Sequence, residues 1–190
     1  MIARSLQFIS VGAFLAIGTA IPAVADLQPG SVARVTFRDV DGNDLSTAAG
    51  YVTIITVASR ENADKAKAVA DRVPDRYIGD QRYRYVTVVN FQGKVPRPLY
   101  GLTRSIIRQR LEAEAKRFRA SYQAKKIGRD PRRDLFVVAD FDGTAVRQLG
   151  LTPESTDVKV FVFNREGKLV ERWANVPPGD SLAKAIDAAE

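Results

Sequence analysis

The sequence contains no cysteine and no histidine among its 190 residues. The absence of cysteine excludes disulfides, thiol nucleophiles, thiol redox chemistry and iron–sulfur ligation. The absence of histidine excludes Ser-His-Asp catalysis, and both absences together exclude the usual zinc ligand sets. Any catalysis would therefore use Asp, Glu, Lys, Arg, Tyr or hydroxyl side chains.

The first 25 residues have the composition of a secretory signal peptide. Arg4 is the only charged residue before Asp26, residues 6–20 are largely apolar, and Ala23-Val24-Ala25 supplies an A-x-A cleavage site. An uncleaved membrane anchor is the alternative, which Pro22 weakens. No later segment is apolar enough to span a bilayer. We expect cleavage after Ala25 and an exported, periplasmic mature chain, 26–190, that forms one domain.

Apolar periodicity in the mature chain predicts alternating strands and helices. Two runs rich in β-branched residues, 51–58 and 84–91, are expected to be buried strands. The other predicted strands cover 32–38, 135–140, 158–164 and 168–173, and the predicted helices cover 60–73, 103–126, 145–149 and 181–189. We expect 51–58 to lie between 84–91, parallel to it because a helix joins them, and 158–164, antiparallel to it. The strand over 168–173 should form the edge.

Three segments in this order resemble the thioredoxin-like superfamily, in its exported TlpA/peroxiredoxin-type branch. They are FRDVDGNDLS at 37–46 with the apolar strand that ends in Ala58-Ser59, FDGTAVRQLGL at 141–151, and VKVFVFNREGKLV at 158–170. Within the superfamily the chain is most similar to the cysteine-less periplasmic proteins called YtfJ-like. The resemblance implies an α/β fold, a thioredoxin-like three-layer α/β/α sandwich whose mixed sheet ends in a C-terminal antiparallel hairpin.

The sequence departs from that superfamily at its redox centre. The superfamily carries C-x-x-C one residue after Ala-Ser, at the start of a helix. Superposing that motif on Ala58-Ser59 places Glu61 and Asp64 at the two cysteine positions, and Val158 at the position of the family's cis-proline. Both parts of the redox centre are missing, so thiol oxidoreductase function does not carry over.

Acidic residues suggest two other sites. Glu61 and Asp64 could form a carboxylate pair for acid–base work, or could stabilise the positive end of the helix dipole. Asp140 and Asp142, in Asp-Phe-Asp-Gly-Thr after an apolar run, match the first motif of Mg²⁺-dependent haloacid-dehalogenase-like phosphotransferases. That motif normally opens its domain, and here it lies near the end of the chain. A turn after a strand is the competing interpretation.

Positive charge is concentrated in residues 97–133, which include the long predicted helix. The segment carries 12 Lys and Arg against three acids, whereas the whole chain has a net charge of +7. The interpretations are a solvated helix face and a contact for an anionic surface or an acidic envelope protein. Arg108, Lys116 and Arg119 are the candidate contact residues. They lie beside the apolar stripe of the predicted helix, which consists of Ile107, Leu111, Ala115, Phe118 and Tyr122. Nucleic acid is not expected in this compartment.

These observations predict an exported, redox-inactive thioredoxin-like protein with a binding or accessory role in the cell envelope. The sequence assigns no catalytic residue, no cofactor and no metal ligand. The alternative hypothesis is a phosphotransferase that uses Asp140 and Asp142.

Overall fold

The computed structural model of the chain describes residues 27–154 and 157–190. The predicted signal peptide, 1–25, lies outside the described residues. In the described part of the chain, no helix combines the length and the apolar character that a membrane span requires.

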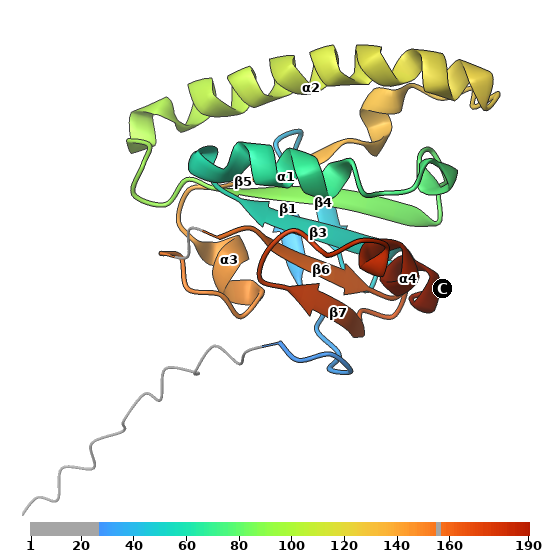
Figure 1. Cartoon of the computed structure of the whole chain (residues 1–190). Helices are drawn as coiled ribbons and strands as arrows, with labels where there is room; N and C mark the ends of the chain where they lie inside the picture. The colour runs from blue at the N-terminus through green and yellow to red at the C-terminus, as the bar shows by residue number, and fades with distance from the viewer. Residues whose placement is uncertain (1–26, 155–156) are drawn as a thin grey trace, which may run out of the picture.

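A five-stranded mixed sheet forms the centre of the fold, in the order β5-β4-β3-β6-β7 (Figure 1). Its strands are β3 (Val52–Ala58), β4 (Tyr83–Asn90), β5 (Phe136–Asp140), β6 (Lys159–Phe163) and β7 (Leu169–Trp173). The central strand β3 pairs in parallel with β4 and antiparallel with β6, and β7 forms an edge. The strand order and directions predicted from the sequence are therefore confirmed.

Each face of the sheet supports a separate apolar core. On one face Ile55, Val88, Phe161 and Phe163 pack with Leu149, which follows α3 (Thr144–Gln148). The small hairpin of β1 (Thr36–Arg38) and β2 (Asp44–Ser46) covers the same face.

On the other face, alternate residues of the same strands pack against α1 (Ala63–Ala70) and α4 (Ser181–Ala188). The long helix α2 (Tyr100–Ala124) lies beyond α1, above the β4–β5 side of the sheet (Figure 1). The protein is thus a three-layer α/β/α sandwich, as predicted.

The helix after β3 begins differently from the prediction. A single 3₁₀ turn, η1 (Arg60–Asn62), precedes α1, because the Asn62 side chain folds back and accepts a hydrogen bond from the Ser59 backbone N–H at 2.7 Å. Glu61 consequently lies in this turn and Asp64 in the first turn of α1.

Only a narrow stripe of residues on helix α2 packs against the rest of the molecule. It begins three residues before the expected Thr103, and its buried residues are Leu111, Ala115 and Tyr122. Ile107 and Phe118, expected on the same stripe, are partly exposed. Most of the surface of α2 therefore faces outward.

Candidate functional site

Glu61, expected at the position of the first lost cysteine, forms an ion pair. Lys94, in the loop after β4, places its Nζ 2.7 Å from Oε2 of Glu61. This hydrogen bond lowers the pKa of the exposed Glu61 carboxyl to about 2. A general acid near neutral pH needs a raised pKa, so Glu61 is unsuited to that role. The hypothesis of a catalytic Glu61–Asp64 pair is not supported.

Val158, expected at the position of the family's cis-proline, belongs to the apolar core. Its side chain is fully buried with Val160 and Leu182. The described backbone contains no cis peptide bond. Together with the absence of cysteine from the whole sequence, this arrangement leaves no thiol redox site at the end of β3.

Asp140 and Asp142 hold the start of α3. Asp140 is 4% exposed, and its Oδ2 accepts a hydrogen bond from the Val146 backbone N–H at 2.9 Å. Burial raises the pKa of Asp140. Asp142 accepts the Thr144 backbone N–H at 3.0 Å, which lowers the pKa of Asp142. Both carboxylates thus accept hydrogen bonds from backbone N–H groups of α3.

The surroundings of these residues also argue against phosphotransfer. Their strand, β5, is an edge strand that pairs only with β4 in the five-stranded sheet, whereas a phosphotransferase of that class needs it at the centre. Among the described residues, no group of three or more acidic side chains is arranged to hold a metal ion. The structure therefore does not support the alternative hypothesis.

Several cations of the basic segment bind within the molecule. Arg108 donates to the Val40 carbonyl oxygen at 2.8 Å and lies 3.4 Å from Asp41. Arg129 pairs with Asp134, and Lys125 donates to the carbonyl oxygens of Asp75 and Ile78. Arg108, one of the candidate contact residues, therefore connects α2 to the turn after β1.

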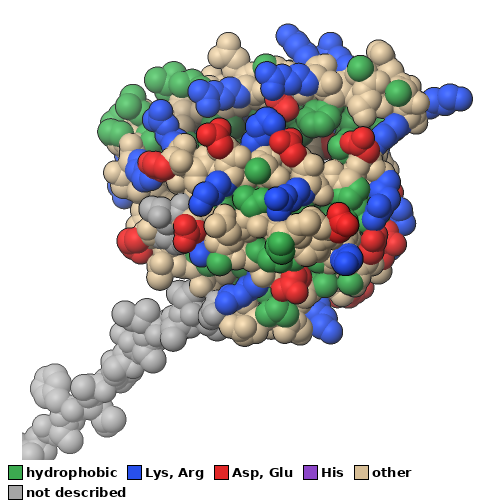
Figure 2. Space-filling model, in the orientation of Figure 1, with side chains coloured by type: hydrophobic (Ala, Val, Ile, Leu, Met, Phe, Trp, Pro, Cys, Tyr) green, Lys and Arg blue, Asp and Glu red, His purple; other side chains and the backbone are tan. Residues whose placement is uncertain are grey.

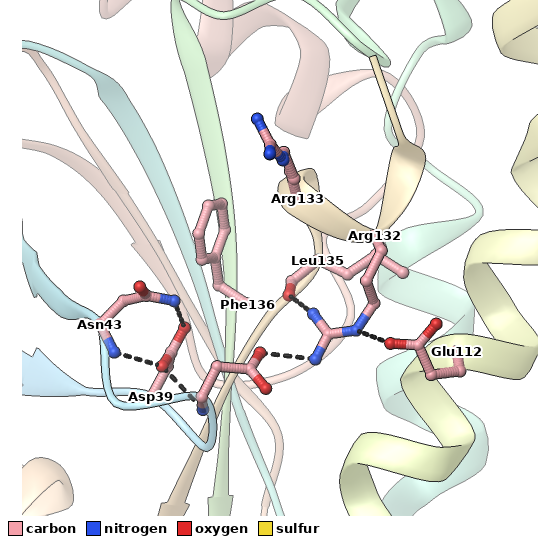
Figure 3. A pocket seen from close by; sticks show the side chains of 8 residues that line it. Asp39, Asn43, Glu112, Arg132, Arg133, Leu135 and Phe136 are labelled. Carbon is pink, nitrogen blue, oxygen red and sulfur yellow. Dashed lines mark hydrogen bonds and ion pairs between the residues drawn. The ribbon is translucent and has the colours of Figure 1, made fainter.

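Arg132 makes the most extensive of these contacts, in a cavity of about 270 Å³ between that turn and α2 (Figure 3). Its guanidinium donates to Asp41 at 2.5 Å, to Glu112 at 3.1 Å and to the Leu135 carbonyl oxygen at 3.3 Å. The Arg132 side chain is only 14% exposed. Arg132 is therefore already paired with two of the acids that line this cavity, whereas Arg133, which also lines it, is exposed.

Six other cations of the segment are unpaired, whereas Arg117 pairs with Glu114 and Arg104 lies over the Phe141 ring. Within the described residues, no ion pair or hydrogen bond is found for a set of exposed side chains that we call the unpaired cations: Arg97, Arg110, Lys116, Arg119, Lys126 and Arg133. Lys116 and Arg119 were predicted contacts and belong to this set. Figure 2 shows Lys and Arg side chains spread along the upper edge of the molecule, over α2.

An exposed apolar patch adjoins the unpaired cations. Leu99, Leu102 and Ile106 are 45%, 58% and 43% exposed at the start of α2. Hydrophobic side chains gather at the upper left of Figure 2, over that end of α2. Sequence reasoning missed this patch, although spacings of three and four residues on a helix place side chains on one face. The outer surface of α2 thus combines an apolar end with a cationic body.

Comparisons with known proteins identify the fold. No protein-family model matches the sequence, and no curated protein matches it significantly. Among solved structures, a candidate thioredoxin from Neisseria meningitidis superposes with a TM-score of 0.54 at 15% identity, over 85% of this chain and 91% of that one.

Two further solved structures superpose on this chain to a similar extent. A peroxiredoxin-like protein from Aquifex aeolicus superposes with a TM-score of 0.53 at 15% identity, over 87% of this chain and 90% of that one. A candidate thiol:disulfide interchange protein DsbE from Chlorobium tepidum gives 0.51 at 16% identity, over 86% and 98%. The chain has a thioredoxin-like fold, and it lacks the cysteines that thiol redox chemistry requires.

Proposed function

We propose that the mature chain, 26–190, is an exported, redox-inactive thioredoxin-like binding protein, similar to the YtfJ-like proteins, that works in the cell envelope. Its partner is anionic, and the contact surface is the outer face of α2. The observation that carries this proposal is the set of unpaired cations, which contrasts with the paired cations Arg108 and Arg132. Lys and Arg side chains without internal partners remain available to an anionic surface.

The apolar patch favours a lipid surface over an acidic protein. Near an anionic bilayer each cation contributes roughly 1 kcal/mol, and apolar side chains on the same helix can enter the boundary between headgroups and acyl chains. Leu99, Leu102 and Ile106 are placed for that insertion beside Arg97 and Arg110. An acidic envelope protein is the second candidate partner.

Charge reversal on α2 tests the proposal. Replacing Arg110, Lys116 and Arg119 by Glu should abolish co-sedimentation with phosphatidylglycerol vesicles at low salt. Arg108 is excluded from this variant because it holds the turn after β1. The matched control reverses Lys65, Arg72 and Lys184, exposed cations outside α2, and changes net charge equally. If the α2 variant still binds vesicles and added salt abolishes that binding, the outer face of α2 is not the contact surface.

The apolar patch is tested separately. Replacing Leu102 and Ile106 by Ser should weaken binding to phosphatidylglycerol vesicles while preserving its salt dependence, because the cations remain. Wild-type protein should not sediment with phosphatidylcholine vesicles. A different result would support the second candidate partner. In that case the protein binds neither type of vesicle but captures an acidic protein from envelope extracts, and the variant with reversed charges on α2 fails to capture it.

A further inference from the structure

The unpaired cations are spread along the whole of α2 and do not converge on one point. Arg97 precedes the helix, Arg110, Lys116 and Arg119 lie within it, and Lys126 follows it. A helix of 25 residues is about 37 Å long. Cations spread over that length cannot all close around one small anion. Their partner must therefore present negative charge over a comparable distance.

The side of α2 that points away from the sheet carries apolar residues along its length. At 3.6 residues per turn, one narrow sector opposite the buried Leu111 contains five exposed apolar residues, which we call the outer stripe. They are Leu102, Ile106, Ala113, Ala120 and Ala124. Arg110 flanks the outer stripe on one side, and Lys116 and Arg119 flank it on the other. An apolar stripe between cations is typical of a helix that lies in the plane of a membrane interface.

We propose that α2 lies along its whole length in the headgroup region of an anionic bilayer, with the outer stripe toward the acyl chains. This inference rests on the proposed function and deepens it, because it identifies the partner as an extended lipid surface and excludes a single bound headgroup. Leu102 and Ile106 enter deepest, because the rest of the outer stripe is alanine. The alanines let the helix approach closely, so the flanking Lys and Arg side chains reach the headgroups by their flexible stems.

This contact also orients the rest of the fold. Helix α2 lies above the β4–β5 side of the sheet, and β7 forms the opposite edge (Figure 1). With α2 in the interface, β7 and the residues that follow it, such as the exposed Ala174, remain in water. The bilayer contact is thereby limited to one side of the molecule.

Single labels along α2 test this orientation. The chain has no cysteine, so an environment-sensitive fluorophore can be attached to one introduced cysteine without background. On binding to phosphatidylglycerol vesicles, labels at Leu102→Cys, Ala113→Cys and Ala120→Cys should all shift their emission to shorter wavelength, whereas a label at Ala174→Cys should not. A shift at position 102 alone would show that only the first turns insert. That result would overturn the in-plane orientation and leave the proposed function intact.

Two double variants of equal charge separate the outer stripe from net charge. Ala113→Glu with Ala120→Glu places carboxylates in the outer stripe, whereas Ser105→Glu with Gln123→Glu places them at exposed positions on the flank of α2. The first variant should bind vesicles roughly tenfold more weakly than the second, because an ionised carboxylate is costly to move out of water. Equal binding by the two variants would overturn the proposal.

A soluble lipid tests whether the partner must be an extended surface. Dihexanoyl phosphatidylglycerol, kept below the concentration at which it forms micelles, should not displace the wild-type protein from vesicles. Displacement would reveal a site for a single headgroup and would overturn the proposal. Absence of vesicle binding by the wild-type protein would contradict the lipid contact of the proposed function, and this proposal with it.

Discussion

Nζ of Lys94 lies 2.7 Å from Oε2 of Glu61, in the turn that follows β3. The contact joins two loops that are 33 residues apart in the sequence. Both side chains are substantially exposed, so the pair adds little to stability in water. Its main effect is to lower the pH at which Glu61 becomes protonated.

The titration of Glu61 follows from this contact. We expect a midpoint of about pH 2 in the folded protein, against a pKa of 4.5 for a free glutamate. The pair's contribution to stability is therefore present above pH 4.5 and is lost as pH falls toward 2. Carboxyl chemical shifts followed by NMR measure the midpoint, and Lys94→Gln should move it toward 4.5. A midpoint near 4.5 in wild type would show that the pair does not form in solution.

Arg132 should be important for stability. Replacing it by Gln leaves Asp41 and Glu112 without their shared guanidinium and should lower the free energy of unfolding by about 1–3 kcal/mol. Urea denaturation measures this loss. The adjacent Arg133 is exposed and unpaired, so Arg133→Gln should change the free energy of unfolding by no more than about 0.5 kcal/mol. Equal losses in the two variants would contradict the role assigned to Arg132.

Sequence patterns predicted the sheet, but they could not show which cations are paired within the molecule. The runs over 51–58 and 84–91 are rich in β-branched residues, so strand identity and pairing direction could be inferred locally. The partners of Arg108 and Arg132 lie 68 and 91 residues away, in the turn after β1. Only the folded chain shows that these two cations are paired while Lys116 and Arg119 are not.

Asp140 illustrates how a local motif can mislead. Its string matches a phosphotransferase motif, yet its carboxylate accepts the Val146 N–H. Asp140→Ala removes that acceptor and should lower the free energy of unfolding by about 1–3 kcal/mol. Asp140→Asn keeps an oxygen acceptor and should lose less.

The pH dependence separates the two effects at Asp140. Burial raises the folded-state pKa of Asp140 above 3.8, so its contribution favours folding below that pH and is lost as pH rises through the folded-state pKa. Asp140→Asn cannot ionise and should gain stability relative to wild type over that rise. Urea denaturation across this range tests the prediction, and a constant difference between the two proteins would refute it.

A half-open groove beneath α2, lined in part by Ala66 of α1 and Tyr85 of β4, also lay beyond sequence reasoning. The alanine stripe of α1 predicted a buried helix face, and the alternation of β4 placed Tyr85 on the same side of the sheet. Neither pattern shows whether side chains from α2 fill the space between them. That depends on the distance between α2 and the sheet. Leu111 and Tyr122, which are buried at separate positions along α2, set this distance by packing against the rest of the molecule.

The two halves of α2 should differ in local stability. The first buried residue of α2 is Leu111, so the turns before it are held mainly by Tyr100, which stacks on Phe141 with ring centroids 4.0 Å apart, and by Arg108. Segments with few buried apolar contacts open locally at low free energy. We expect amides of residues 104–110 to exchange faster than those of 112–122 in hydrogen-exchange measurements. Tyr100→Ala should speed exchange in the first half only, whereas Ser105→Ala, at an exposed position, should change neither. Uniform protection along α2 would show that the exposed apolar end is held by contacts other than the Tyr100 stack.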